Sequence, residues 1–168
     1  MAPRLDSDKA LFLRRRAAER GATLVEVALA SIVFLMLIVG ILDYGKIHYM
    51  RSRLQHAVSQ SARFAVVGRT LDDPDKPGEK LSRDASIAYL IKKISGLNGL
   101  ADKDIDIRAV DRTGRSAKGA GGAGDIVTVQ ATYRVKVLAP YLAPLFENRQ
   151  YEFTSSTTFK NEEFTSGT

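Results

Sequence analysis

A glycine, an alanine and a glutamate stand at a spacing that suits proteolytic processing followed by ion pairing. The stretch "RGATLVEVAL" contains Gly21, Ala22 and, four residues after Ala22, Glu26. If the peptide bond between Gly21 and Ala22 is hydrolysed, Ala22 gains an ammonium group about one helical turn from the Glu26 carboxylate. That ammonium can be the counter-ion of a carboxylate in apolar surroundings, within one chain or between chains. The residues therefore make Gly21, Ala22 and Glu26 candidates for a cleaved N-terminus that pairs with a carboxylate.

The segment that must position Glu26 is the apolar run of residues 22–42, in which Glu26 is the one ionisable residue. As a helix this run is about 31 Å long, which matches a hydrocarbon core of about 30 Å. It therefore predicts a transmembrane helix. A cleaved secretory signal has a shorter apolar region of about 7 to 15 residues, and twin-arginine export would need more than the arginines of "RRRAAERG". A simpler alternative for Glu26 is that the helix begins after it, with the carboxylate at the headgroups.

The stretch "RGATLVEVAL…GILDYGKIHYMRSRLQHAVSQSARFAV", residues 20–66, resembles the TadE-like family of minor pseudopilins of the tight-adherence (Flp) pilus system. The resemblance implies a basic cytoplasmic leader of residues 1–21 that a prepilin peptidase removes before Ala22. It also implies that Glu26 acts in assembly, and that the partners are other pilins and pseudopilins and an inner-membrane assembly platform. One departure is Ile32, which stands where this family often has proline, so a straighter helix is expected.

The function that the resemblance implies is that of a minor pseudopilin, not an enzyme, which initiates, caps or regulates assembly of a Flp/Tad type IV pilus used in cell adhesion and biofilms. Such a protein crosses the bacterial inner membrane once, with a cytoplasmic N-terminus and a periplasmic domain. A TadF-like role, the place in the fibre and N-methylation of Ala22 stay open. The alternative is an uncleaved, membrane-anchored extracytoplasmic binding or sensor domain, and the mass of the mature N-terminus separates the two hypotheses.

Residues 43–66 continue the membrane helix as an amphipathic extension. Their apolar positions share one stripe, which Arg51 interrupts: Ile47, Leu54, Val58, Ala62 and Ala65. Together the two segments predict one helix of about 45 residues, roughly 65 Å long. Its first half is expected to lie in membrane lipid and its second half to pack on a domain.

Residues 67–168 are expected to form an extracytoplasmic α+β domain. After a proline-containing loop, "SRDASIAYLIKKISG" predicts a short helix with Ser82 as its N-cap and Gly96 at its end. The period-two stretches "DIDIRAV", "DIVTVQATYRVKVL" and "QYEFTSSTTFK" predict an antiparallel sheet of three strands packed on the long helix. "APYLAP" interrupts the pattern at Pro140 and Pro144, and the loop 111–124 is long enough to be mobile.

Three other patterns resemble binding sites. The acidic positions of the loop 72–79, Asp72, Asp73, Asp75 and Glu79, could bind calcium, but their spacing is not that of an EF-hand, so a solvated turn is favoured. "GAGGAG", residues 119–124, spells a dinucleotide fingerprint, but a strand is expected after it instead of a helix, which favours a flexible loop. His48 and His56 are eight residues apart, with no acid or cysteine spaced to complete a metal site or triad. No cofactor, metal or catalytic residue is therefore predicted.

The charge of the chain argues against nucleic acid as a partner. Its formal charge is +6, and removal of residues 1–21 takes away six Lys/Arg and three Asp/Glu, which leaves +3. Half of the positive charge therefore belongs to the leader, and no concentrated basic face remains. The absence of cysteine excludes disulfides and cysteine-ligated metals.

Overall fold

The computed structural model describes residues 5–163, including the side chains of residues 21, 23–142, 144–146 and 148–163. The chain forms two compact units, Met1–Asp43 and Tyr44–Thr168. Helix α1, Leu5–Val66, supplies the described part of the first unit and the first element of the second. It begins earlier than predicted because residues 5–20 are rich in alanine, leucine and arginine, which are strong helix formers. The first four residues of the expected leader lie outside the described part.

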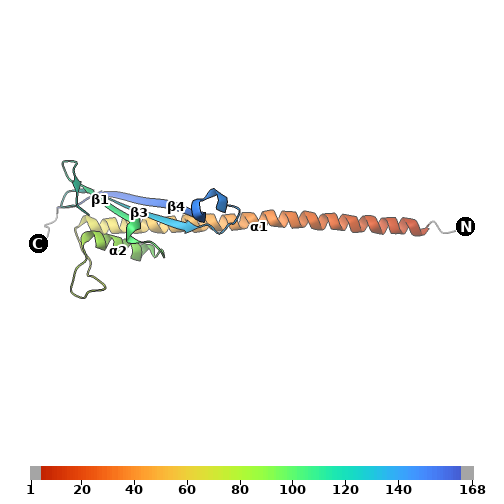
Figure 1. The fold of residues 1–168 in the computed structure, drawn as a ribbon, viewed down its shortest axis with the longest axis horizontal. Coiled ribbons are helices and arrows are strands. Elements are labelled where there is room, and N and C mark those ends of the chain that lie inside the picture. Colours follow the sequence, from red (N-terminus) through yellow and green to blue (C-terminus); the bar gives the residue numbers. More distant parts are fainter. Residues whose placement is uncertain (1–4, 164–168) are drawn as a thin grey trace. The chain divides into compact units, whose positions relative to one another are not determined.

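The second unit is an α+β domain, as predicted (Figure 1). Its helix α2 is Arg83–Ser95, and short 3-10 turns occur at Asp102–Asp104 (η1), Ala143–Leu145 (η2) and Glu147–Arg149 (η3). Its strands are β1 (Ile105–Val110), β2 (Ser116–Ala117), β3 (Ile126–Lys136) and β4 (Gln150–Lys160). The strand order is β2-β1-β3-β4, and every neighbouring pair is antiparallel.

The inner face of the sheet follows the alternation predicted from the sequence. Strand β3 pairs with β4 in one unbroken register, from Ile126 opposite Lys160 to Lys136 opposite Gln150. The inward residues of β3 are buried in one apolar core with residues of β1 and β4: Val127, Val129, Ala131, Val135, Ala109 and Phe153. The alternate positions face outward, where Thr128 and Thr132 form hydroxyl pairs with Thr158 and Thr154 at 2.9 and 3.1 Å.

The part of α1 within this unit supplies the other side of the core. The predicted apolar stripe is confirmed: Leu54, Val58 and Ala65 are fully or almost fully buried, and Arg51 is exposed. Residues Ile87 and Ile91 of α2 belong to the same core. The two helices therefore cover the inner face of the sheet, and the domain depends on the second half of α1.

The ends of α2 also match the prediction. The Ser82 hydroxyl accepts a hydrogen bond from the Ala85 N–H at 3.2 Å, and so caps the first turn. Gly96 has φ 54° and ψ 26°, the left-handed conformation that glycine adopts readily at a helix end, and its N–H donates to the Lys92 carbonyl.

The sheet has a fourth strand, so the prediction of three strands was one strand short. The two-residue strand β2 pairs with the end of β1 and lies within the loop expected to be mobile. The Asp111 carboxylate closes the turn by accepting hydrogen bonds from the backbone N–H groups of Thr113 (2.7 Å) and Arg115 (2.8 Å). The Thr113 hydroxyl, followed by these amides, holds the pKa of Asp111 below its ordinary value. The turn is therefore stabilised at neutral pH, and this stabilisation is lost as the pH falls through the lowered pKa.

The glycine loop 119–124 is also bonded to the domain, contrary to the expectation of a flexible loop. Its carbonyls at 120 and 122 accept hydrogen bonds from the Asn161 side-chain amide at 3.0 and 2.7 Å. The Arg83 guanidinium donates to the carbonyl of residue 121 at 2.6 Å, to the Ala65 carbonyl at the end of α1, and to the Asn161 side chain. Arg83 and Asn161 thus join the loop to both helices, and burial lowers the pKa of Arg83.

We expect Asn161→Ala to lower the free energy of unfolding by about 2–4 kcal/mol, because it leaves buried carbonyls and part of Arg83 without a partner. Urea unfolding of the chain in detergent, followed by circular dichroism, measures the change. Asn98→Ala is the matched control, since the Asn98 side chain is exposed, and it should change stability by less than about 0.5 kcal/mol. Equal midpoints for the two variants would contradict the structural role of this bond network.

Candidate assembly site on the N-terminal helix

Gly21 and Glu26 both lie on α1, and both residues are exposed. A side chain added at Gly21 would meet nothing within 4 Å. Residues 22 and 26 are four apart on α1, which is about one helical turn. An ammonium at a cleaved Ala22 would therefore be within reach of the carboxylate, although the Ala22 side chain lies outside the described residues. Among the side chains that the structure describes, none forms an ion pair with Glu26.

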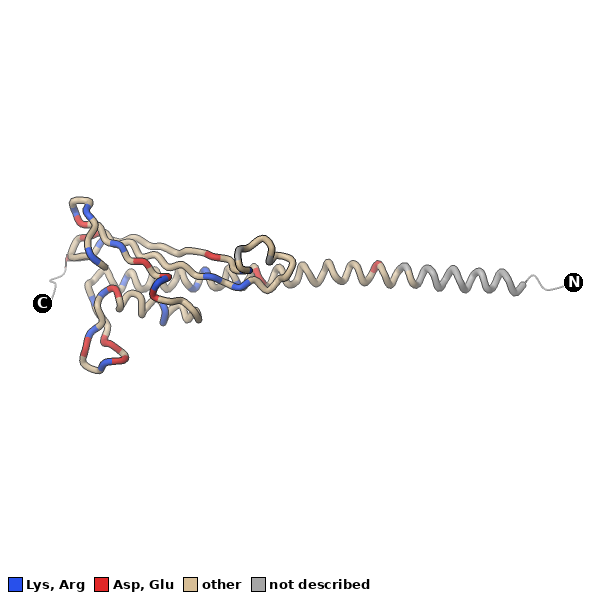
Figure 2. Tube along the Cα trace, viewed as in Figure 1, with Lys and Arg blue, Asp and Glu red and all other residues tan. Residues whose placement is uncertain are grey.

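The apolar side chains that follow Glu26 are uncovered in the single chain. Leu24, Phe34 and Ile41 have exposed fractions of 71, 63 and 68 %. Figure 2 shows the corresponding stretch of α1 as a run without charge after one acidic position. In the part of the chain that the structure describes, this helix is the one long and apolar enough to cross a membrane. It is therefore compatible with a single-pass membrane anchor.

The Ser31 hydroxyl, which lies within this run, forms a hydrogen bond inside its own helix. Ser31 Oγ donates to the Val27 carbonyl at 2.7 Å, an arrangement that lets a serine enter lipid without an unpaired donor. Glu26 is different because a carboxylate requires a donor or a cation that its own helix backbone cannot supply. If this part of α1 lies in lipid, Glu26 is the position where a partner group would be needed.

The other sequence candidates do not form a metal site among the described residues. His48 and His56 are both exposed, and the His48 ring stacks on Tyr44 with centroids 6.2 Å apart. In the acidic loop, the Asp73 carboxylate accepts a hydrogen bond from the Asp75 N–H, and Lys76 pairs with Glu79 at 3.3 Å. The glycine loop precedes strand β3, as predicted, whereas a dinucleotide site requires a helix.

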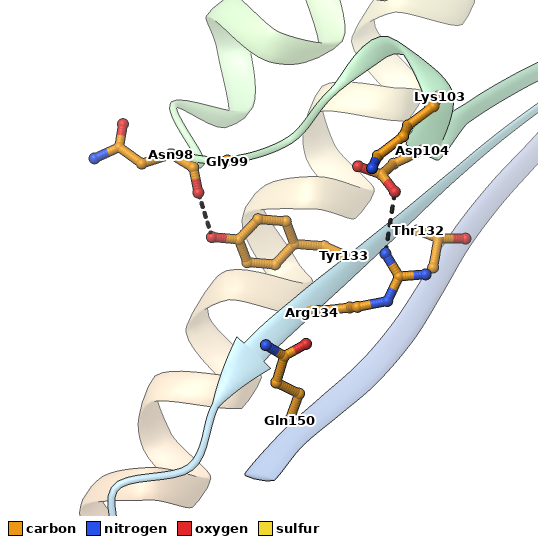
Figure 3. Close-up of a pocket in the computed structure, with 8 residues that line it drawn as sticks. All are labelled: Asn98, Gly99, Lys103, Asp104, Thr132, Tyr133, Arg134 and Gln150. Atoms are coloured by element: carbon orange, nitrogen blue, oxygen red, sulfur yellow. Dashed lines mark hydrogen bonds and ion pairs between the residues drawn. The ribbon is translucent and has the colours of Figure 1, made fainter. Parts of the chain in front are cut away.

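A polar pocket of about 250 Å³ lies between the end of α2 and strands β3 and β4 (Figure 3). The Tyr133 hydroxyl donates to the Asn98 carbonyl at 2.8 Å. Arg134 contacts Asp104 at 3.2 Å and Glu152 at 2.7 Å, and these two carboxylates, Glu152 foremost, raise its pKa. Since these groups bond to one another, the pocket is best explained as a structural contact that joins the α2–β1 connection to the sheet.

Sequence reasoning missed one feature, the exposed apolar loop between β3 and β4. Leu138 and Leu145 have exposed fractions of 64 and 74 %. The signal in the sequence is the uncharged stretch "VLAPYLAPLF" of residues 137–146.

Comparison with known proteins agrees with the geometry of the N-terminal helix. The family model described as TadE-like protein matches residues 21–63, from the glycine through the apolar run into the half of α1 that packs in the domain. No curated protein and no solved structure matches the chain. The match confirms the resemblance predicted from the residues: over residues 21–63 the chain is similar to TadE-like protein.

Proposed function

We propose that this protein is a minor pseudopilin that initiates, caps or regulates assembly of a Flp/Tad type IV pilus. TadE-like proteins are associated with the Tad pilus, and this chain shares their N-terminal segment. In the proposal, residues 1–21 are a cytoplasmic leader, residues 22–42 cross the inner membrane, and the domain lies on the periplasmic side. Its partners are a prepilin peptidase, other pilins and pseudopilins, and the inner-membrane assembly platform.

The observation that carries the proposal is the contrast between the two halves of α1. In the second half, residues such as Leu54 and Val58 are buried in a domain core, whereas the apolar side chains from Leu24 to Leu42 are exposed. Apolar surface of this extent must be covered by another phase. Lipid covers it before assembly, and the helices of neighbouring pilins replace lipid in the fibre. Glu26 would then meet the Ala22 ammonium of its own or a neighbouring chain.

Processing is the first test of this function. We expect the chain co-expressed with its cognate prepilin peptidase to begin at Ala22, and Gly21→Ala to be cut far less efficiently. The substitution adds a methyl group in open space and favours the helix, so any loss reports on recognition by the peptidase and not on the fold. Intact mass spectrometry of the membrane-extracted protein measures the N-terminus.

Gly45→Ala is the matched control, because Gly45 is also in α1 and also has open space at its Cβ position. It should be processed like the wild type. Unchanged cutting of Gly21→Ala would count against the assigned bond. A wild-type chain that keeps residues 1–21 would favour the alternative, a permanently anchored extracytoplasmic domain.

A further inference from the structure

The loop that connects β3 to β4, residues 137–149, is a folded unit with an apolar sequence. The Val137 N–H donates to the Arg149 carbonyl at 3.0 Å and closes its neck, while turns at Leu142 and Leu145 fold its interior. Asn148 and Arg149 have φ values of 53° and 56°, a left-handed conformation that costs energy in residues other than glycine. The loop is therefore a compact excursion held in one shape, of the kind that often carries function.

In this conformation the loop exposes two leucine side chains to solvent. Ala139 is fully buried and fixes the loop to the domain, whereas Leu138 and Leu145 on either side of it have exposed fractions of 64 and 74 %. Pro140 and Pro144 are exposed between them. From residue 137 to residue 146 the loop carries no charge. A folded loop with an apolar surface and no charge indicates a contact with another apolar phase.

The position of the loop identifies that phase. Lys46 of α1 donates a hydrogen bond at 3.1 Å to the carbonyl of Lys136, the residue directly before the loop. Lys46 follows Leu42, the end of the apolar run, by four residues, which is about 6 Å of helix. In Figure 1 the loop lies beside α1 at the end of the sheet where β3 ends and β4 begins. If residues 22–42 span a bilayer, Lys46 follows the end of the span by only four residues, and the neck of the loop, which is bonded to Lys46, is close to the lipid headgroups.

The surroundings of the loop have the composition of a membrane interface. Tyr44 and Tyr49 are exposed by 72 and 61 % on the same stretch of α1, and tyrosine is enriched at the boundary between lipid and water. Lys136 and Arg149, at the two ends of the loop, are exposed and can reach anionic headgroups. Exposed leucines, tyrosines and basic residues together have the composition that fits a phospholipid surface.

We propose that the loop 137–149 rests on the bilayer, with Leu138 and Leu145 in its interfacial layer. This inference rests on the proposed membrane anchoring of α1. The domain then has two attachments to the membrane, the helix and the loop, and is held at a fixed orientation instead of pivoting on a single helix. The same loop leaves lipid when the subunit enters a fibre.

The chain contains no tryptophan, so a single introduced tryptophan reports its own surroundings. The experiment uses Leu145→Trp in the full chain, reconstituted in vesicles of phosphatidylethanolamine and phosphatidylglycerol with or without brominated acyl chains. Because Leu145 is exposed, the substitution leaves the core intact. We expect blue-shifted emission that loses most of its intensity in brominated vesicles.

Two further variants make the result decisive. Ile126→Trp is the matched control, because Ile126 is 48 % exposed and lies at the opposite end of β3, about 34 Å along the strand from Lys136. Its emission should be that of tryptophan in water, with no quenching. Phe34→Trp, in the middle of the apolar run, should be strongly quenched if α1 spans the bilayer.

The three readings separate the possible failures. Quenching at Phe34→Trp and Leu145→Trp but not at Ile126→Trp supports the inference. Quenching at Phe34→Trp alone overturns the loop contact and leaves the anchor in place. Blue-shifted emission of Leu145→Trp without bromine quenching shows a protein contact and also overturns it. No quenching at Phe34→Trp refutes the membrane anchor, and the loop contact with it.

Discussion

Glu26→Gln is expected to abolish piliation while the protein stays at its normal level in the membrane. Glutamine has almost the shape of glutamate, and the Glu26 side chain is exposed on α1, so the change disturbs no packing within the chain. Insertion should become easier, because a charge at the centre of a membrane helix costs roughly 2.5–3.5 kcal/mol on translocon scales and a charge nearer the end, such as Glu26, costs part of that. Any loss of pili therefore arises after insertion.

The expected loss follows from the group left behind. In the assembled fibre the Ala22 ammonium would remain among apolar helices without its carboxylate. Removing one partner of a buried ion pair costs about 3–5 kcal/mol. At about 1.4 kcal/mol per tenfold change, each affected contact weakens by roughly a hundredfold to several thousandfold. A fibre that repeats or starts from such a contact does not form.

Counting pili by electron microscopy, beside immunoblots of the membrane fraction, measures the effect. Glu26→Asp keeps the charge on a shorter side chain and should retain part of the assembly, whereas Ser31→Ala changes the polarity of the same helix without touching the proposed pair and should assemble normally. Equal pili on Glu26→Gln and wild-type cells at equal protein levels would refute the pairing role. That outcome is the one expected of a glutamate at the headgroups with no partner.

The elements that could be predicted are those fixed by local pattern. Residues 22–66 have continuous apolar or amphipathic character and no proline, and residues 127–135 alternate strictly, so α1 and β3 follow from periodicity alone. The caps Ser82 and Gly96 follow from the backbone groups that a helix end leaves unpaired. Strand β2 could not be found in this way, because two residues carry no periodicity and their pairing depends on the turn that Asp111 closes.

The contacts that escaped prediction join segments distant in sequence. Arg83 and Asn161 are separated by 78 positions, and nothing in either neighbourhood indicates that both bind the glycine loop. The candidate site differs, because its residues are close together in the sequence. Gly21 and Glu26 could be singled out because their spacing is local, but the group that Glu26 is proposed to meet arises only after cleavage or on another chain.

The other large effect concerns the boundary of the domain. A fragment of residues 44–168 is expected to fold cooperatively, and a fragment of residues 67–168 is expected to remain unfolded. The compact unit begins at Tyr44, so it includes residues 44–66 of α1. The reason is that residues 44–66 supply one wall of the core, including Leu54, which is completely buried.

The size of the effect follows from the surface that loses its cover. Burial of a large apolar side chain contributes about 1.5–3 kcal/mol, and deletion of residues 44–66 removes Leu54 and Val58 and also exposes the residues that they touch. Arg83 and the Glu162 N–H, which bond to the Ala65 and Val66 carbonyls, lose their acceptors as well. Since an entire domain is stable by only about 5–15 kcal/mol, this loss is enough to unfold it. Circular dichroism and urea titration of both fragments measure the difference.

A point variant separates the loss of the core from the loss of chain length. Within residues 44–168, Leu54→Asp places an unpaired carboxylate in the apolar core and should unfold the fragment, because a buried charge without a partner is among the most costly substitutions. Gln55→Asp adds the same charge on the exposed side of the same helix turn and should leave the fold intact. If residues 67–168 fold alone, or if the Leu54→Asp fragment stays folded, the second half of α1 is not required for the domain to fold. If both changes unfold the domain, residues 44–66 are an integral part of its core.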